Sequence, residues 1–167
     1  MSRLQEYKVP FIGLKVGIHE YEFELDSKFF EEFEYSEMDN GEVNVHLALE
    51  RKENMMVLDF DLRGVIETLC DRCGTNVQIP IESQQQLVVK FGEETGTTDD
   101  EILEIGPSVY ELDLFQYLYE YIILALPARR THESDEDCDQ DAIDRLEQFN
   151  DEEEKTDPRW DALKNIK

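Results

Sequence analysis

Residues 43–74, VNVHLALERKENMMVLDFDLRGVIETLCDRCG, decide the fold that we expect for this chain. Apolar and polar residues alternate in it twice, over 43–49 and again over 58–62, and the polar residues 51–54 lie between the two runs. A period of two places alternate side chains on opposite faces of a β-strand, so one face is apolar and the other is hydrated. The stretch therefore predicts two neighbouring strands joined by a turn, with one face of the sheet in water.

Shorter alternating runs flank this stretch on both sides. Residues 12–18 and 21–25 alternate with a shift of one residue between them, which predicts a hairpin or a β-bulge. Residues 77–81 and 87–91 predict two more short strands. About six or seven strands would thus precede the first helix, an order that is typical of an α+β protein. We expect an antiparallel sheet or a partly open β-barrel.

The first strong helical pattern begins at Asp113, whose side chain can cap the helix while Gln116 reaches back to it. Apolar residues then recur at helical spacing until Pro127 ends the run; they are Phe115, Leu118, Tyr119 and Ile122. We expect this one main helix to cover the sheet. The acidic segment 91–106 has no period and is expected to be an exposed loop.

The composition favours a protein that binds other proteins. The 167 residues suit one folded domain with appendages, and 16 Lys and Arg against 41 Asp and Glu give a formal net charge of -25. Such a charge repels phosphate backbones and anionic membranes, so basic proteins are the favoured partners. The sequence shows no export signal, its longest apolar run is residues 121–126, and its three cysteines suit a reducing compartment. We therefore expect a cytoplasmic protein that does not enter a membrane.

We expect three parts: an α+β core of residues 1–128, an acidic and mobile tail of residues 129–157, and a short docking helix of residues 158–167. The tail is dominated by Asp and Glu, the composition of a solvated segment. Three apolar residues at helical spacing interrupt it, which are Ile143, Leu146 and Phe149. Their stripe is marginal without a surface to pack on. The terminal residues have a helix-capping pattern followed by apolar and basic side chains. Those expected to contact a partner are Asp157, Pro158, Arg159, Trp160 and Leu163.

The sharpest local feature is CDRCG, residues 70–74. A spacer of two residues lets the thiolates of Cys70 and Cys73 bind one metal ion, and the glycine permits a left-handed turn after the second cysteine. Strand-like residues flank the motif on both sides, so we place it at a hairpin tip, the position of a zinc knuckle. Redox cysteine pairs instead begin a helix. The motif therefore favours a structural zinc ion, with a thiol redox pair as the alternative.

A tetrahedral zinc site needs two further nitrogen or sulfur ligands. Cys138 is the third cysteine of the chain, and His132 lies six residues before it, just beyond the main helix. We predict one structural zinc ion held by Cys70, Cys73, His132 and Cys138. The alternative is that His132 and Cys138 face solvent in a mobile acidic segment and that the thiols are simply reactive.

Catalytic motifs are missing from the sequence. It contains no GxSxG, HExxH, Walker or GxGxxG pattern, and its carboxylates are too evenly spread to nominate an acid–base pair. His19 and His46 have no acid, serine or cysteine at a motif spacing. We therefore expect a binding protein with neither enzymatic activity nor a small-molecule substrate, and an unrecognised hydrolase is the least favoured hypothesis.

Four features recur in the order of one known family. They are GVIETLCDRC at 64–73, DLFQYLYEYIILALP at 113–127, His132 with Cys138, and DPRWDALKNIK at 157–167. Together they resemble the YceD family, bacterial and plastid proteins linked to accumulation of large-subunit ribosomal RNA. The resemblance implies a non-enzymatic role in the synthesis, processing or stability of 23S ribosomal RNA. Some members have a second cysteine pair in the tail, where this chain has only Cys138.

Together, the resemblance and the charge predict a ribosome-biogenesis factor. We expect it to bind a large ribosomal subunit precursor or a basic ribosomal protein, with the acidic tail mimicking RNA and the terminal helix as an anchor. The net charge disfavours gripping RNA directly through phosphate contacts. The alternative from a different class is a redox sensor or chaperone in which Cys70 and Cys73 cycle between dithiol and disulfide.

Overall fold

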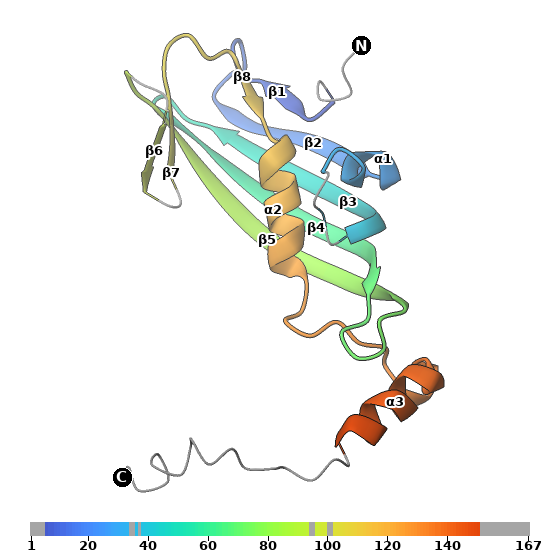
Figure 1. Ribbon diagram of the computed structural model, residues 1–167. Helices are drawn as coiled ribbons and strands as arrows, with labels where there is room; N and C mark the ends of the chain where they lie inside the picture. Colours follow the sequence, from blue (N-terminus) through green and yellow to red (C-terminus); the bar gives the residue numbers. More distant parts are fainter. Residues whose placement is uncertain (1–5, 34–35, 37, 94–95, 100–101, 151–167) are drawn as a thin grey trace, which may run out of the picture.

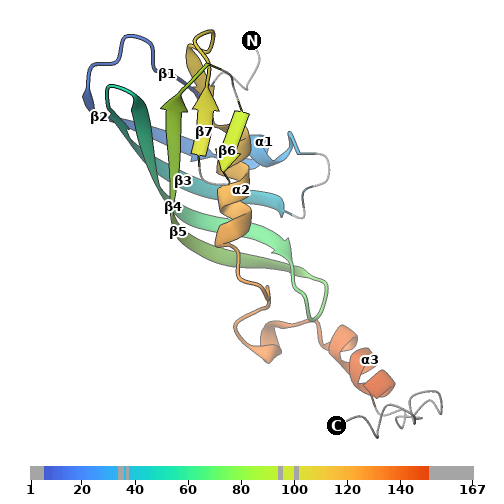
Figure 2. The ribbon, with the colours of Figure 1, turned by 90° about the vertical axis from the view of Figure 1, so that its left-hand side faces the viewer.

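A computed structural model describes residues 6–33, 36, 38–93, 96–99 and 102–150 of the chain (Figure 1). A mixed α+β architecture results, in which one large sheet carries a helix across one face (Figures 1 and 2). In chain order the elements are β1 (Lys8–Pro10), β2 (Gly17–Leu25), α1 (Ser27–Phe30), β3 (Met38–Arg51), β4 (Met55–Leu69), β5 (Asn76–Phe91), β6 (Gly96–Asp99), β7 (Ile102–Ile105), β8 (Glu111–Asp113), α2 (Phe115–Ala125), the 3₁₀ turn η2 (Asp135–Asp137) and α3 (Gln140–Asn150).

The large sheet has six strands in the order β2-β3-β4-β5-β7-β6, and β1 pairs with β8 in a separate two-stranded sheet. Neighbouring strands of the large sheet are antiparallel except for β5 and β7, which are parallel. The prediction of an antiparallel sheet is therefore wrong for that one pair. The sheet is not closed into a barrel, because its end strands, β2 and β6, do not pair with each other.

The two alternating runs that dominate the sequence lie in β3 and β4, as predicted. Leu49 of β3 pairs with Leu58 of β4, which pairs with Leu87 of β5, and all three side chains are buried on the same face. Polar residues occupy the opposite face, where Asp59 and Asp61 accept hydrogen bonds from Gln86 and Gln84 of β5. One apolar and one hydrated face follow directly from the period of two.

Three predicted segments differ from the structure. Residues 12–16 turn instead of extending, since Gly13 and Gly17 have φ of 91° and 139°, and the strand begins only at Gly17. The expected pair of short strands at 77–81 and 87–91 is one long strand, because β5 keeps its register with β4 from end to end. The segment 91–106 is not a loop alone, since it contributes β6 and β7 to the sheet edge.

The main helix α2 covers the apolar face of the sheet, as predicted (Figure 1). Leu118 and Ile122 are fully buried, and the ring of Tyr121 lies 5.1 Å from that of Phe60 on β4. The Asp113 carboxylate accepts a hydrogen bond from the Phe115 backbone N–H at 3.1 Å, but the helix starts one residue later than predicted, with Leu114 at the N-cap position and no side-chain cap. The expected return bond from Gln116 is wrong, because that side chain donates to Glu120 one turn later.

A short helix that the periodicity did not predict, α1, begins after Asp26, whose carboxylate accepts a hydrogen bond from the Lys28 backbone N–H at 3.0 Å. It packs against β2 and β3 and buries Phe29 and Phe30. The ring of Phe29 lies 5.2 Å from that of Tyr7 and 5.1 Å from that of Phe115. Local capping thus positions an aromatic cluster that joins the N-terminal segment to the start of α2.

Residues beyond α2 pass the end of the β4–β5 hairpin and form η2 and α3 (Figures 1 and 2). The stripe predicted from Ile143, Leu146 and Phe149 does lie on a helix, α3, where Leu146 and Phe149 are exposed. The division into core, tail and docking helix stays a prediction, and the docking helix 158–167 lies outside the described residues.

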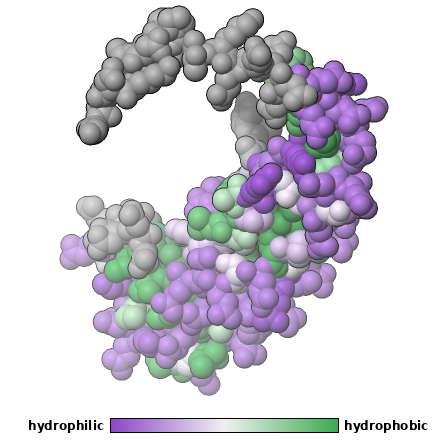
Figure 3. Space-filling view, turned by 90° about the horizontal axis from the view of Figure 1, so that it is seen from below, coloured by the Kyte–Doolittle hydropathy of each residue, from purple (hydrophilic) through white to green (hydrophobic). Residues whose placement is uncertain are grey.

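The face of the molecule seen from below is mostly hydrophilic. Polar and charged side chains cover much of this face, and apolar side chains gather in smaller patches (Figure 3). Among the helices that the structure describes, none combines the length and the apolar character needed to cross a bilayer.

Candidate metal centre

The CxxC motif forms the turn between β4 and β5, the position predicted from its strand-like flanks. The last register pair is Leu69 with Asn76, so the turn consists of the six residues between them. The Cys70 N–H donates to the Thr75 carbonyl at 2.8 Å, and the Gly74 N–H donates to the Cys70 carbonyl at 2.9 Å. Gly74 has φ of 76°, which a residue with a side chain rarely adopts. This tight turn brings the two cysteines onto one side of the hairpin.

A second segment, residues 129–138, docks against this turn. The Asp71 N–H donates to the Arg130 carbonyl at 2.7 Å, and the Asp71 carboxylate accepts a bond of the same length from the Arg130 N–H. The Arg130 guanidinium also pairs with Asp71 at 3.3 Å, and Arg72 pairs with Asp135. The Asp71–Arg130 contacts join residues 59 positions apart in the chain. They carry His132 and Cys138 to the hairpin tip.

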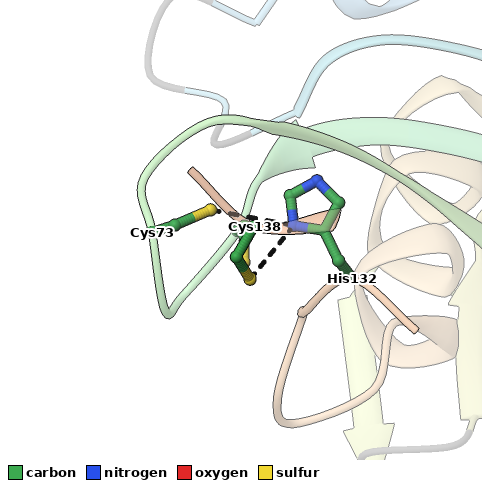
Figure 4. A group of neighbouring side chains, drawn as sticks. Cys73, His132 and Cys138 are labelled. Carbon is green, nitrogen blue, oxygen red and sulfur yellow. Dashed lines mark hydrogen bonds between the residues drawn. The ribbon is translucent and has the colours of Figure 1, made fainter. Parts of the chain in front are cut away.

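Four potential ligands meet at this junction. The ligand atoms of Cys70, Cys73, His132 and Cys138 all lie within 4.8 Å of one another. The Nδ1 atom of His132 lies 3.7 Å from the Sγ atoms of both Cys73 and Cys138 (Figure 4). In a tetrahedral site with Zn–S near 2.3 Å and Zn–N near 2.0–2.1 Å, a sulfur and a nitrogen ligand lie about 3.5–3.6 Å apart. These two distances are close to those of a tetrahedral zinc site.

The orientation of His132 fits metal binding as well. Its Nε2 lies 3.2 Å from the Asn76 carbonyl, to which only a protonated nitrogen can donate. In the neutral ring this leaves Nδ1, the atom that faces the cysteines, without a proton and able to bind a cation. A backbone carbonyl that fixes the far nitrogen of a histidine ligand is a common feature of zinc sites. Three sulfurs and one such nitrogen are a donor set that zinc prefers.

Burial and hydrogen bonding give the thiols different acidities. Cys70 and Cys138 are 2% and 5% exposed, whereas Cys73 is half-buried. The Thr75 hydroxyl, 3.1 Å from the Cys73 sulfur, lowers the pKa of that thiol to about 6, and burial raises the pKa of Cys138 to about 11. Burial of Cys70 acts to raise its pKa, but backbone N–H groups of Cys73 and Arg72 outweigh it and lower the pKa. A bound dication would stabilise all three thiolates.

The predicted ligands therefore lie together, whereas the predicted partner contacts cannot be placed. The open alternative of a solvent-facing Cys138 does not fit its burial. The supporting residues Thr75, Asn76 and the Asp71–Arg130 pair were not predicted, since their roles depend on contacts between distant segments. Asp157, Pro158, Arg159, Trp160 and Leu163 lie outside the described residues.

Much of the chain, including the four residues of the cluster, matches a known protein family. The model of the family described as Large ribosomal RNA subunit accumulation protein YceD matches residues 58–167, well over half of the chain. The match covers all four residues of the cluster and begins within β4. No curated protein sequence and no solved structure matches the chain. The chain therefore belongs to the YceD family, whose name links it to the accumulation of large-subunit ribosomal RNA.

Proposed function

We propose that this protein is a non-enzymatic ribosome-biogenesis factor. It supports the synthesis, processing or stability of 23S ribosomal RNA in the cytoplasm by binding a large ribosomal subunit precursor or a basic ribosomal protein. The observation that carries the proposal is the family match over residues 58–167. No small-molecule substrate is part of this function.

The charge of the chain supports contact with protein in preference to RNA. A formal charge of -25 repels a phosphate backbone, while it attracts the basic segments that ribosomal proteins present before they meet RNA. The acidic residues 129–157 would hold such a partner, and Asp157, Pro158, Arg159, Trp160 and Leu163 would anchor it. Because such attraction acts at long range between exposed charges, it weakens as salt is added.

In this proposal the metal centre is structural. A zinc ion bound by Cys70, Cys73, His132 and Cys138 would cross-link the β4–β5 turn to the segment after α2. The ion supplies a fixed tetrahedral junction and no reaction. Since α3 begins two residues after Cys138, the junction would also fix where the acidic segment leaves the core. Binding of the metal ion would then be coupled to the positioning of the acidic segment.

Truncation after Asn150 tests the binding role while all four cluster residues remain. We expect the truncated chain to stay folded and to be lost from precursor particles in sucrose gradients. The full chain should sediment with precursors at low salt and be released at high salt. A second variant replaces Trp160 and Leu163 by alanine in the full chain, and we expect the same loss. Unchanged sedimentation of both variants would show that the C-terminal segment is not the contact.

A thiol redox sensor or chaperone is the second candidate, favoured by the low pKa of Cys73 beside two other thiols. Its weakness is that Cys70 lies in a hairpin turn and is buried, without the helix N-terminus that activates redox pairs. Metal analysis of freshly purified protein separates the two. One zinc per chain, lost in Cys70→Ser, supports the structural centre. Metal-free protein with a reversible bond between Cys70 and Cys73 supports redox function.

A further inference from the structure

A groove far from the metal centre combines negative charge with an aromatic floor. It has a volume of about 160 Å³ and lies between the N-terminal segment, the end of β2, α1 and the start of α2. Four carboxylates line it, from Glu6, Glu24, Asp26 and Glu32, together with one basic residue, Lys28. We call this site the aromatic groove.

The carboxylates of the aromatic groove are poorly neutralised. The Lys28 ammonium lies 4.0 Å from Asp26, at the limit of an ion pair, and its side chain is 64% exposed. Within the part of the chain that the structure describes, Glu6, Glu24 and Glu32 have no ion-pair partner. Like charges gathered around a concave surface focus a negative potential there and attract a cation.

The floor of the groove suits a cationic side chain. It consists of Tyr7, Phe29 and Phe115, whose ring centroids lie between 5.1 and 5.7 Å from one another. Tyr7 and Phe29 are 8% and 1% exposed, so the surrounding structure fixes the rings and leaves little of their faces open. The carboxylates therefore supply the attraction for a basic side chain, and the rings supply a fixed apolar wall beside its stem.

The edge of the sheet continues from this groove. β2 is an end strand that pairs with β3 on one side, and no other described strand pairs with its outer side. Its exposed alternate residues are Ile18, Glu20, Glu22 and Glu24, the last of which also lines the groove. An edge strand offers backbone hydrogen bonds to an extended segment, and a row of glutamates at every second position matches basic residues at the same period.

We propose that the aromatic groove and the adjoining edge of β2 bind an extended protein segment with arginine or lysine at alternate positions. One basic side chain enters the groove, while the others face Glu20 and Glu22 and the backbone pairs with β2. RNA is not the occupant, because its phosphates would meet the same carboxylates. The inference deepens the proposed function, on which it rests for the identity of the partner as a basic ribosomal protein.

Two synthetic peptides test this surface with the full chain. In one, arginine alternates with threonine; the other has the same composition with the arginines in one block. Fluorescence anisotropy at low salt should show tighter binding of the alternating peptide. Glu24→Gln with Glu32→Gln should weaken that binding about fivefold, the effect of two partly exposed ion pairs. The matched control, Glu53→Gln with Glu93→Gln, removes the same charge from two exposed residues outside the groove and outside residues 129–157, and should leave affinity nearly unchanged.

Amide hydrogen exchange identifies the docking mode. We expect the alternating peptide to slow exchange at amides of β2 and the block peptide to leave them unchanged. Equal affinity for both peptides, equal weakening by both pairs of substitutions, or unchanged β2 exchange would overturn the inference. Binding of oligouridine that is lost in Glu24→Gln with Glu32→Gln would overturn it too. If neither peptide binds but the full chain still sediments with precursor particles, only this surface is refuted. If the wild-type chain does not sediment with precursor particles, the proposed function is refuted.

Discussion

Replacement of Cys138 by serine should separate the two halves of the metal centre. Cys138 is the ligand that the segment after α2 contributes beside His132, and its sulfur lies 3.7 Å from the His132 Nδ1. Binding of structural zinc is worth about 10–16 kcal/mol in small zinc domains, so one of four ligands accounts for about 3–4 kcal/mol. Serine should therefore weaken zinc binding by about two to three orders of magnitude.

Competition with a chromophoric chelator measures that loss, and calorimetry of metal-loaded protein measures the accompanying fall in melting temperature. Ser134→Ala is the matched control, because Ser134 lies in the same segment and its hydroxyl caps only η2. We expect the control to keep one tightly bound zinc per chain. An affinity of Cys138→Ser within a few-fold of the wild-type value would refute the proposed ligand set.

Three further changes test the fold. Leu118→Ala should lower the free energy of unfolding by about 3 kcal/mol, measured in urea, because the fully buried side chain leaves a cavity between α2 and the sheet. Gly64→Ala should lower it by about 2 kcal/mol, since the new Cβ would lie 2.1 Å from the Glu42 carbonyl oxygen, a clash that outweighs the gain in strand propensity. Burial raises the pKa of Tyr121 from 10.0 to about 12, so the native state holds this proton more tightly, and stability should fall as pH rises through that window. Tyr121→Phe should reduce that alkaline decline in urea titrations, and an unchanged pH dependence would contradict the assignment.

The sequence predicts the centre of the sheet well because the signal there is local. Alternation in β3 and β4 sets which side chains face α2, and the short turn between them sets the pairing. The pairing of β5 with β7 has no such signal. Residues 91–106 have no regular apolar period, yet β6 and β7 complete the edge of the sheet. Gly13 likewise turns a run that alternates like a strand.

The metal cluster shows the same division between local and distant information. Cys70 and Cys73 are recognisable from their spacing and their flanking strands alone. That His132 and Cys138 join them depends on the Asp71–Arg130 contacts, which connect two segments with no common pattern. The histidine tautomer depends on the Asn76 carbonyl, a backbone group that side-chain chemistry cannot reveal.

The most direct test of the central claim is the amount of newly made 23S ribosomal RNA in cells depleted of this protein. Pulse-labelled 23S should fall relative to 16S ribosomal RNA, and the wild-type chain should restore it while Cys70→Ser should not. An unchanged ratio of the two RNAs after complete depletion would contradict a role in large-subunit RNA accumulation.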